Sequence, residues 1–169
     1  LGERGLGDAL RAFTAQWSRQ TGIRVEFTSQ GEGRLPVASG QAVYRVCQEA
    51  LANVARHSRA ELVRIELACN GAARQARLAR AVCPTLEMEG MAYLKISDDG
   101  CGFDPASVRA GVGLRSMRER VESLGGMLQL ASCPGGGTCV EVILPVEPGV
   151  LMEEEVHDGD KGRFGIDRG

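Results

Sequence analysis

Apolar residues recur along this chain with two different periods, and each period predicts one type of element. An apolar position at every third or fourth residue indicates a helix with one buried face, whereas strict alternation indicates a strand with one buried face. The helical period covers residues 8–21, 40–57 and 114–124. Alternation covers residues 23–27, 62–68, 92–97, 127–131 and 138–144. The chain is therefore expected to contain both helices and strands.

Two segments do not fit this pattern. About two dozen residues separate the strands expected at 62–68 and 92–97, far more than the ~2–5 residues of an ordinary hairpin. We interpret residues 70–91 as a loop insert within a domain formed by residues 1–145. Residues 146–169 are acidic, contain several glycines and have few large apolar side chains, so we expect a disordered tail there.

The helix expected at residues 40–57 carries polar side chains beside its apolar face. Val43, Val46, Cys47, Ala50, Leu51 and Val54 form one continuous apolar stripe. Since each helical residue turns the chain by about 100°, Glu49, Asn53 and His57 fall on a second stripe next to the first. These three side chains are therefore expected at the rim of the buried surface, where a side chain that lines a cleft belongs.

Glycine-rich sequences follow the strand at 92–97, open the last helix and precede the last strand. They are Asp98-Asp99-Gly100-Cys101-Gly102, Gly111-Val112-Gly113-Leu114 and Gly135-Gly136-Gly137-Thr138. Glycines before a helix allow backbone N–H groups to approach a phosphate, and the helix dipole favours its negative charge. A carboxylate at a strand end can accept a hydrogen bond from an exocyclic amine such as that of adenine, and an asparagine oxygen is a suitable Mg²⁺ ligand. Together these features indicate a Mg²⁺–nucleotide site.

Composition and spacing argue against several other classes. The 20 basic and 22 acidic residues give a net charge of -2, which does not support a nucleic-acid binder that works by bulk charge. No stretch approaches the ~18–20 apolar residues of a membrane helix, and the six cysteines lack the spacing of zinc or redox pairs. We expect a cytoplasmic segment without membrane contact. A dinucleotide-binding fingerprint would need glycine at Pro105 and Ser116, and no Gly-Lys-Ser/Thr of a P-loop occurs.

Four runs, in this order, resemble the motifs of the ATP-binding domain of histidine kinases, a member of the GHKL group that includes gyrase, Hsp90 and MutL. QEALANVARHSRA resembles the N box, ISDDGCGFDP the G1 box, GVGLRSMRERVESLGG the G2 box and PGGGTCVEVILP the closing strand. The sequences GLRSMRER and GGGT are similar to those of the nitrate/nitrite-sensor (NarX/NarQ-like) and DesK-like branch. The resemblance covers roughly residues 6–145. It implies the Bergerat fold, an α+β two-layer sandwich in which a mixed, mainly antiparallel sheet is packed on one side by about three helices.

The resemblance implies roles for the polar side chains of these motifs. Asn53 would coordinate Mg²⁺, and His57 would contact the phosphates of ATP. Asp98 would accept a hydrogen bond from the adenine amino group, and Thr138 would support the adenine pocket through its hydroxyl. Glu49 would be the catalytic residue of the N box, acting as a base, as a partner of a Mg²⁺-bound water or as a group that orients the helix.

The resemblance also implies roles for backbone groups. Gly100 and Gly102 would let the chain pass close to the base. Gly111, Gly113 and the amide of Leu114 would hold phosphate as a lid closes over the nucleotide.

Two further choices concern charged residues within the motifs. The spacing Asp-x-Gly-x-Gly selects Asp98 as the adenine ligand and leaves Asp99 as a residue that forms a turn. Arg115, Arg118 and Arg120 are interpreted mostly as a solvated helix face, from which one arginine could reach the γ-phosphate or a partner.

The resemblance implies transfer of the ATP γ-phosphate to a histidine on a dimerisation domain, followed by transfer to a response regulator of the NarL/FixJ type. The chain starts at Leu1, after the point where that dimerisation domain would end. We therefore expect a fragment that binds ATP and cannot phosphorylate itself alone. Two alternatives stay open: a GHKL-type ATPase in which Glu49 activates water, and a non-catalytic interaction module of the same fold.

Overall fold

The computed structural model describes residues 5–31, 35–69, 91–106 and 112–145. The helices are α1 (Leu6–Thr21), α2 (Val37–Asn53), the π-helical segment η1 (Val54–Ser58) and α4 (Val112–Glu122). The strands are β1 (Arg24–Gln30), β2 (Leu62–Cys69), β3 (Met91–Asp98), β4 (Met127–Ser132) and β5 (Thr138–Pro145). The tail expected at 146–169 and the insert expected at 70–91, apart from Met91 in β3, lie outside the described residues.

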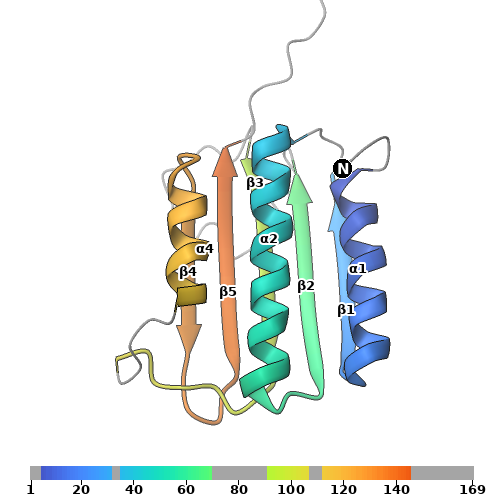
Figure 1. The fold of residues 1–169 in the computed structure, drawn as a ribbon, viewed down its shortest axis with the longest axis vertical. Helices are drawn as coiled ribbons and strands as arrows, with labels where there is room; N and C mark the ends of the chain where they lie inside the picture. The colour runs from blue at the N-terminus through green and yellow to red at the C-terminus, as the bar shows by residue number, and fades with distance from the viewer. Residues whose placement is uncertain (1–4, 32–34, 70–90, 107–111, 146–169) are drawn as a thin grey trace, which may run out of the picture.

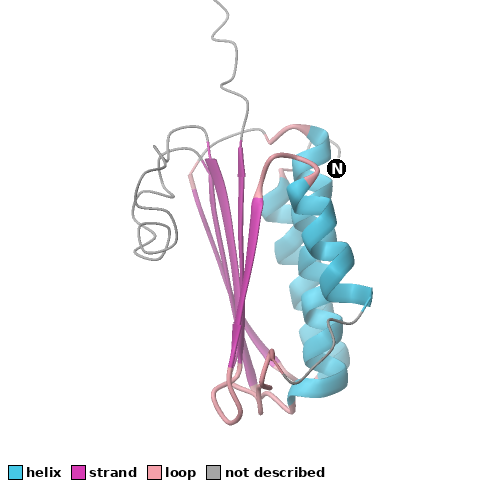
Figure 2. Ribbon diagram, turned by 90° about the vertical axis from the view of Figure 1, so that its left-hand side faces the viewer, coloured by secondary structure: helices cyan, strands magenta, loops and turns pink. Residues whose placement is uncertain are grey.

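The five strands form one sheet in the order β1-β2-β3-β5-β4. β1 pairs with β2 in parallel, and the other three pairs are antiparallel. In Figure 1, α1 lies over the β1 edge of the sheet, α2 over its centre and α4 over its β4 edge. Figure 2 shows that these helices cover one and the same face. The expected two-layer sandwich with a mixed, mainly antiparallel sheet is confirmed.

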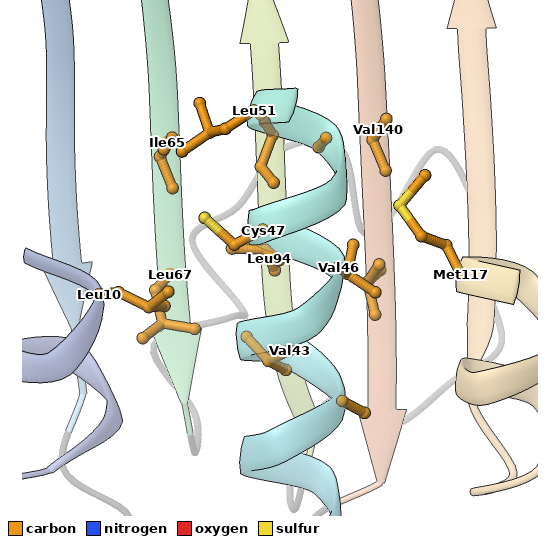
Figure 3. Packing of buried hydrophobic residues seen from close by; sticks show 14 of the residues in the cluster. Leu10, Val43, Val46, Cys47, Leu51, Ile65, Leu67, Leu94, Met117 and Val140 are labelled. Carbon is orange, nitrogen blue, oxygen red and sulfur yellow. The ribbon is translucent and has the colours of Figure 1, made fainter. Parts of the chain in front are cut away.

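The core lies between the helices and the sheet face that they cover. Side chains of α2 point toward the strands along the whole helix, as Figure 3 shows for Val43, Val46, Cys47 and Leu51. Alternate residues of the strands meet them, among others Ile65 of β2. Since burying one such aliphatic side chain contributes about 1.5–3 kcal/mol, this layer supplies the main driving force for folding.

The ends of the elements differ from the expected ones where hydrogen bonding overrides hydrophobic period. β1 continues to Gln30 because its parallel register with β2 pairs Gln30 with Ala68. The helix expected at 40–57 begins three residues earlier, at Val37, and it is α-helical only to Asn53. Its last part is the wider π-helix η1, a form that a 3.6-residue period cannot predict and that is often found at functional sites. Within the described residues, we find no helix with the length and apolarity needed to cross a bilayer.

Candidate functional site

A cavity of about 400 Å³ opens between the C-terminal end of α2 with η1, the ends of β3 and β5, and the start of α4. Its size is within the range of small-molecule sites. Its apolar lining comes from Ala50, Val54, Ile96, Phe103, Leu114, Leu130 and Val140. Its polar side chains are those of Asn53, His57, Ser58, Asp98, Cys101 and Thr138. Gly102 and Gly113 complete it. An apolar cleft with a few converging polar groups is suited to a flat base that carries a polar edge.

The register of the sheet explains why polar side chains meet at one end of this cavity. Thr138 of β5 pairs with Asp98 of β3 on one side and with Ser132 of β4 on the other. These three residues continue the phase of Ile96, Val140 and Leu130, which lie two positions away on the helix-covered face. The last row of that face is therefore polar across three strands, whereas the row before it is apolar.

Asp98 is half-buried at the end of β3. Its Oδ1 accepts a hydrogen bond from the Gly100 amide at 2.9 Å. Burial raises the pKa of this carboxyl, and the nearby charge of Asp99 adds to the rise, while the backbone amides of Gly100 and Thr138 act in the opposite direction. Because desolvation is the dominant cause, the charged form gains when a ligand offers N–H donors.

Asp99 faces a different environment. Its Oδ1 accepts hydrogen bonds from the amides of Glu61 at 2.9 Å and Leu62 at 3.0 Å. The Leu62 amide is the largest cause of its lowered pKa. Asp99 thus fastens the end of β3 to the start of β2 and does not line the cavity. The structure places Asp98 at the cavity, as the spacing selected, and assigns Asp99 a fastening role in place of the expected turn.

The glycines of the G1 run permit contacts within the chain. A Cβ at Gly100 would overlap the Ser58 carbonyl oxygen. Gly102 has φ +56, and a Cβ there would overlap the carbonyl oxygens of Cys133 and Gly137. Gly102 lines the cavity, whereas Gly100 does not. The structure shows a packing role for both glycines, the close approach of this loop to η1 and to the β4–β5 turn. Their expected role next to a base stays a prediction.

Asn53 and His57 line the cavity from the helical layer. Asn53 is the last residue of α2 and His57 belongs to η1. The η1 segment is tied to the loop after β3 by two contacts: the Cys101 amide donates to the Ser58 carbonyl at 2.7 Å, and Cys101 Sγ donates to the His57 carbonyl at 3.3 Å. Of the three residues that sequence reasoning placed on one stripe, Asn53 and His57 thus line the same cavity as Asp98.

Glu49 lines a second cavity of about 350 Å³ on the other side of Gly113. A Cβ at Gly113 would overlap the Glu49 carboxylate, so the carboxylate lies directly against the start of α4. Arg45 and Arg120 line the same cavity. Glu49 is thus separated from the larger cavity, in which the other expected side chains meet.

The structure distinguishes the three arginines of α4. Arg120 lines the second cavity. Arg115 pairs with Glu119 at 2.7 Å on the exposed face, and Arg118 is exposed without lining either cavity. Sequence reasoning missed Arg45, although its position one helical turn before Glu49 was a usable signal.

Backbone groups at the start of α4 lie between the two cavities. Gly113 lines both, and Leu114 lines the larger one. The first N–H groups of a helix have no partners within it and favour a negative group. Gly111, expected to act with them, lies outside the described residues. Phe103 was not singled out in the sequence, although it is the one aromatic residue of the run 99–106, and it lines the larger cavity.

The chain matches the family described as histidine kinase-, DNA gyrase B- and HSP90-like ATPases over residues 38–148. The chain belongs to this family. The described part of the fold is that of a solved histidine kinase domain.

Curated relatives are sensor kinases. The sensor histidine kinase MctS of Rhizobium johnstonii is 33% identical over 143 residues, which cover 82% of this chain and 27% of that protein. LiaS of Bacillus subtilis is 31% identical over 90% of this chain and 37% of its own length. UhpB of Salmonella typhimurium, a signal transduction histidine-protein kinase/phosphatase, is 40% identical over 61% of this chain and 17% of its length. The chain thus spans well under half the length of these relatives.

Solved structures show the same fold. The histidine kinase domain of the Erythrobacter litoralis EL346 blue-light activated kinase superimposes with a TM-score of 0.62 at 20% identity, covering 84% of this chain and 61% of that one. The mycobacterial sensor histidine kinase MprB superimposes with a TM-score of 0.55 at 21% identity, covering 85% and 93%.

Proposed function

We propose that this chain binds ATP in the larger cavity and that the protein to which it belongs is a sensor histidine kinase. The observation that carries the proposal is the convergence of Asp98, Thr138, Asn53 and His57 on one cavity of about 400 Å³, in a chain of the histidine kinase-like ATPase family. The four side chains come from segments far apart in the sequence, and a solely structural role would not require them to face a common space.

The adenine base would lie on the apolar floor formed by Ile96, Val140 and Leu130. Its amino group would donate to Asp98, next to Thr138. The phosphates would then extend toward Asn53 and His57 and toward the start of α4, where Gly113 and Leu114 offer backbone N–H groups. Two glycines would let the chain pass close to the base, Gly100 and Gly102. Gly111 would help to hold the phosphate.

Mg²⁺ fits this site only together with the nucleotide, because the described part of the protein supplies few of the oxygen ligands. Among the described residues, no group of three or more His, Cys, Asp or Glu side chains could hold a metal ion. A Mg²⁺ ion there would share its shell between the Asn53 amide oxygen, water and phosphate oxygens, which is its usual manner of binding nucleotides. When bound, Mg²⁺ reduces the charge repulsion between the phosphates and an attacking group. Asn53 would orient it.

The reaction is phosphoryl transfer to a histidine on a separate dimerisation domain. The imidazole nitrogen forms a bond to the γ-phosphorus, the bond from that phosphorus to the bridging oxygen breaks, and ADP leaves. Glu49 lies beyond Gly113, at the side where the terminal phosphate would end. In this position its carboxylate can take the proton that the attacking imidazole loses, while Arg120 and Arg45 balance the charge of the phosphate.

The partners follow from the same proposal. Besides the dimerisation domain, the kinase would pass its phosphoryl group to a response regulator of the NarL/FixJ type. The sequences GLRSMRER and GGGT favour the NarX/NarQ-like or DesK-like branch of sensor kinases. The domain would act in the cytoplasm, where ATP is available.

Titration of the chain with Mg²⁺–ATP tests the proposal. The wild type should bind, and Asp98→Asn and Asn53→Ala should both bind more weakly. If both variants bind as the wild type does, the assignment of the site is wrong.

Steady ATP hydrolysis by this chain alone, abolished in Glu49→Ala, would instead support the ATPase alternative. Absence of any ATP-dependent rise in thermal stability would support the non-catalytic module, since a ligand at ~100 times its Kd stabilises by about 2.7 kcal/mol.

A further inference from the structure

Ser132 joins three segments that surround the larger cavity, although it is not one of the lining residues. Its Oγ lies 2.9 Å from the Phe103 amide nitrogen, 2.8 Å from the Gly137 carbonyl oxygen and 3.0 Å from Thr138 Oγ1. Phe103 belongs to the loop after β3, and Gly137 and Thr138 lie at the start of β5. A substitution of Ser132 is therefore expected to affect two of the residues that line the cavity, Phe103 and Thr138.

Counting donors and acceptors determines the direction of each of these hydrogen bonds. A serine hydroxyl has one proton to donate and two lone pairs that accept. The Gly137 carbonyl can only accept, so Ser132 donates its proton there. The Phe103 N–H can only donate, so it uses one lone pair of Ser132. The contact with Thr138 is then a hydrogen bond only if Thr138 donates its proton to Ser132.

We propose that Ser132 is a positioning residue that makes Thr138 act only as an acceptor toward the ligand, so that this end of the cavity selects a purine with an amino group at position 6. The proposal rests on the proposed function, because it assumes a nucleotide whose base lies beside Asp98. Thr138 pairs with Asp98 across β3 and β5, and both line the cavity. With the proton of Thr138 held by Ser132, the carboxylate and the hydroxyl both present lone pairs.

Two adjacent acceptors distinguish purines by the group at position 6. An amino group can donate one proton to each of them. With a keto oxygen at position 6, the oxygen faces their lone pairs, and the only donor left on that edge of the base is the single N–H at position 1. A site built to accept two hydrogen bonds discriminates against an analogue that offers only one donor, because one of its own polar groups is then left unpaired. Asp98 supplies one part of this selection, and the orientation of the Thr138 hydroxyl supplies the other.

The test compares Mg²⁺–ATP with Mg²⁺–ITP, in which a keto oxygen replaces the amino group and N1 carries a proton, by isothermal titration calorimetry on the 169-residue chain. In Ser132→Ala, the Thr138 hydroxyl recovers a free proton and can donate to the keto oxygen. The ratio Kd(ITP)/Kd(ATP) should fall about three- to tenfold, the factor that one neutral hydrogen bond is worth. Ser123→Ala is the matched control and should leave the ratio unchanged, since Ser123 Oγ also donates to a carbonyl, that of Arg120 at 2.9 Å, away from the cavity.

The Thr138 hydroxyl provides the second arm. In Thr138→Val, the loss of an acceptor should weaken the binding of ATP more than that of ITP, so the ratio Kd(ITP)/Kd(ATP) should fall. Adding Ser132→Ala to this variant should change the ratio no further. This arm stands even if Ser132→Ala alone does not fold. A ratio that rises or stays constant in Thr138→Val overturns the inference, as does a Ser132→Ala variant that weakens both nucleotides equally. Ser132→Thr, which keeps the hydroxyl, should restore the wild-type ratio.

Failure of the proposed function gives a different result. The wild type would then bind neither nucleotide, or Asp98→Asn would bind ATP as the wild type does. In both cases the proposed function and the inference that rests on it fail together, whereas normal Asp98-dependent ATP binding with an unchanged ratio contradicts the role of Ser132 alone.

Discussion

At one end of the candidate site, polar groups are held by strands and by backbone hydrogen bonds, whereas at the other end charged side chains reach out from helices. We call the first the strand end, formed by Asp98, Gly102, Ser132 and Thr138. We call the second the helix end, formed by Arg45, Glu49, Gly113 and Arg120. Asp98 and Thr138 are neighbours in a sheet register, while Glu49 and Gly113 meet only because α2 packs against α4.

The difference predicts how each end responds to change. At the strand end a new atom would collide with backbone, which cannot move without disturbing the sheet. At the helix end it would collide with the end of a flexible side chain, which can rotate away. The strand end is therefore suited to recognise a rigid base, and the helix end is suited to a step in which groups move. The following predictions test this comparison, first by stability and then by nucleotide binding, and each group runs from the largest expected effect to the smallest.

Gly102→Ala should cause the largest loss of stability. The residue has φ +56, and its Cβ would overlap two carbonyl oxygens, so we expect the free energy of unfolding to fall by about 2–5 kcal/mol. Urea denaturation measures it. Gly135→Ala is the control for the left-handed backbone alone, because Gly135 has φ +78 and nothing within 4 Å of a Cβ; it should lose about 1–2 kcal/mol.

Gly113→Ala gives the opposite outcome for stability at the helix end. Its Cβ would meet only the Glu49 side chain, so the free energy of unfolding should change by less than about 1 kcal/mol. ATP binding should weaken, because the added methyl group lies at the start of α4. If Gly113→Ala unfolds as readily as Gly102→Ala, the proposed contrast between the two ends is wrong.

Asp98→Asn should weaken Mg²⁺–ATP about 10- to 100-fold, the range for hydrogen bonds to a charged group. Calorimetric titration measures the effect. Asp99→Asn is the matched control: it should reduce stability, because the Glu61 and Leu62 amides lose a charged acceptor, while the folded protein binds ATP as before. Equal loss of affinity in both variants would contradict the choice of Asp98.

Acidification should weaken ATP binding at a higher pH than an ordinary aspartate would cause. Burial raises the pKa of Asp98 above its ordinary value of 3.8, so the carboxylate is lost earlier as the pH falls. The folded state of the free protein binds this proton more readily than the unfolded state, so the contribution of Asp98 to stability decreases as pH rises from 3.8 through its raised pKa. The decrease should be absent in Asp98→Asn, and thermal unfolding across pH would reveal it.

Arg120→Ala should have the smallest effect, a two- to fivefold weakening of ATP, roughly the factor that an exposed charge contributes. Arg115→Ala, which removes an exposed pair with Glu119, should leave binding unchanged. The difference between the two should shrink at high salt because exposed charges are screened. If the two variants weaken ATP binding equally, the second cavity does not contribute to nucleotide binding through Arg120.

Much of the architecture follows from the sequence. Alternation in 92–97 and 138–144 predicted β3 and β5 to within one residue at each end, because a buried strand face requires period two. The position of Asn53 and His57 beside an apolar stripe also followed from helix geometry. The π-helical form of η1 did not, because it depends on hydrogen bonds that leave no periodic trace.

The sequence alone determined which residues carry polar groups on a buried face: Asp98 and Thr138 each continue an apolar alternation. Only the tertiary structure decided that they are neighbours, since alternation sets the phase of each strand but not the order β3-β5-β4. The same holds for Ser132, whose hydroxyl acquires a fixed direction only when Phe103 and Gly137 lie beside it. Glu49 is the reverse case, because a stripe on one helix placed it with Asn53, whereas the packing of α4 separated the two at Gly113.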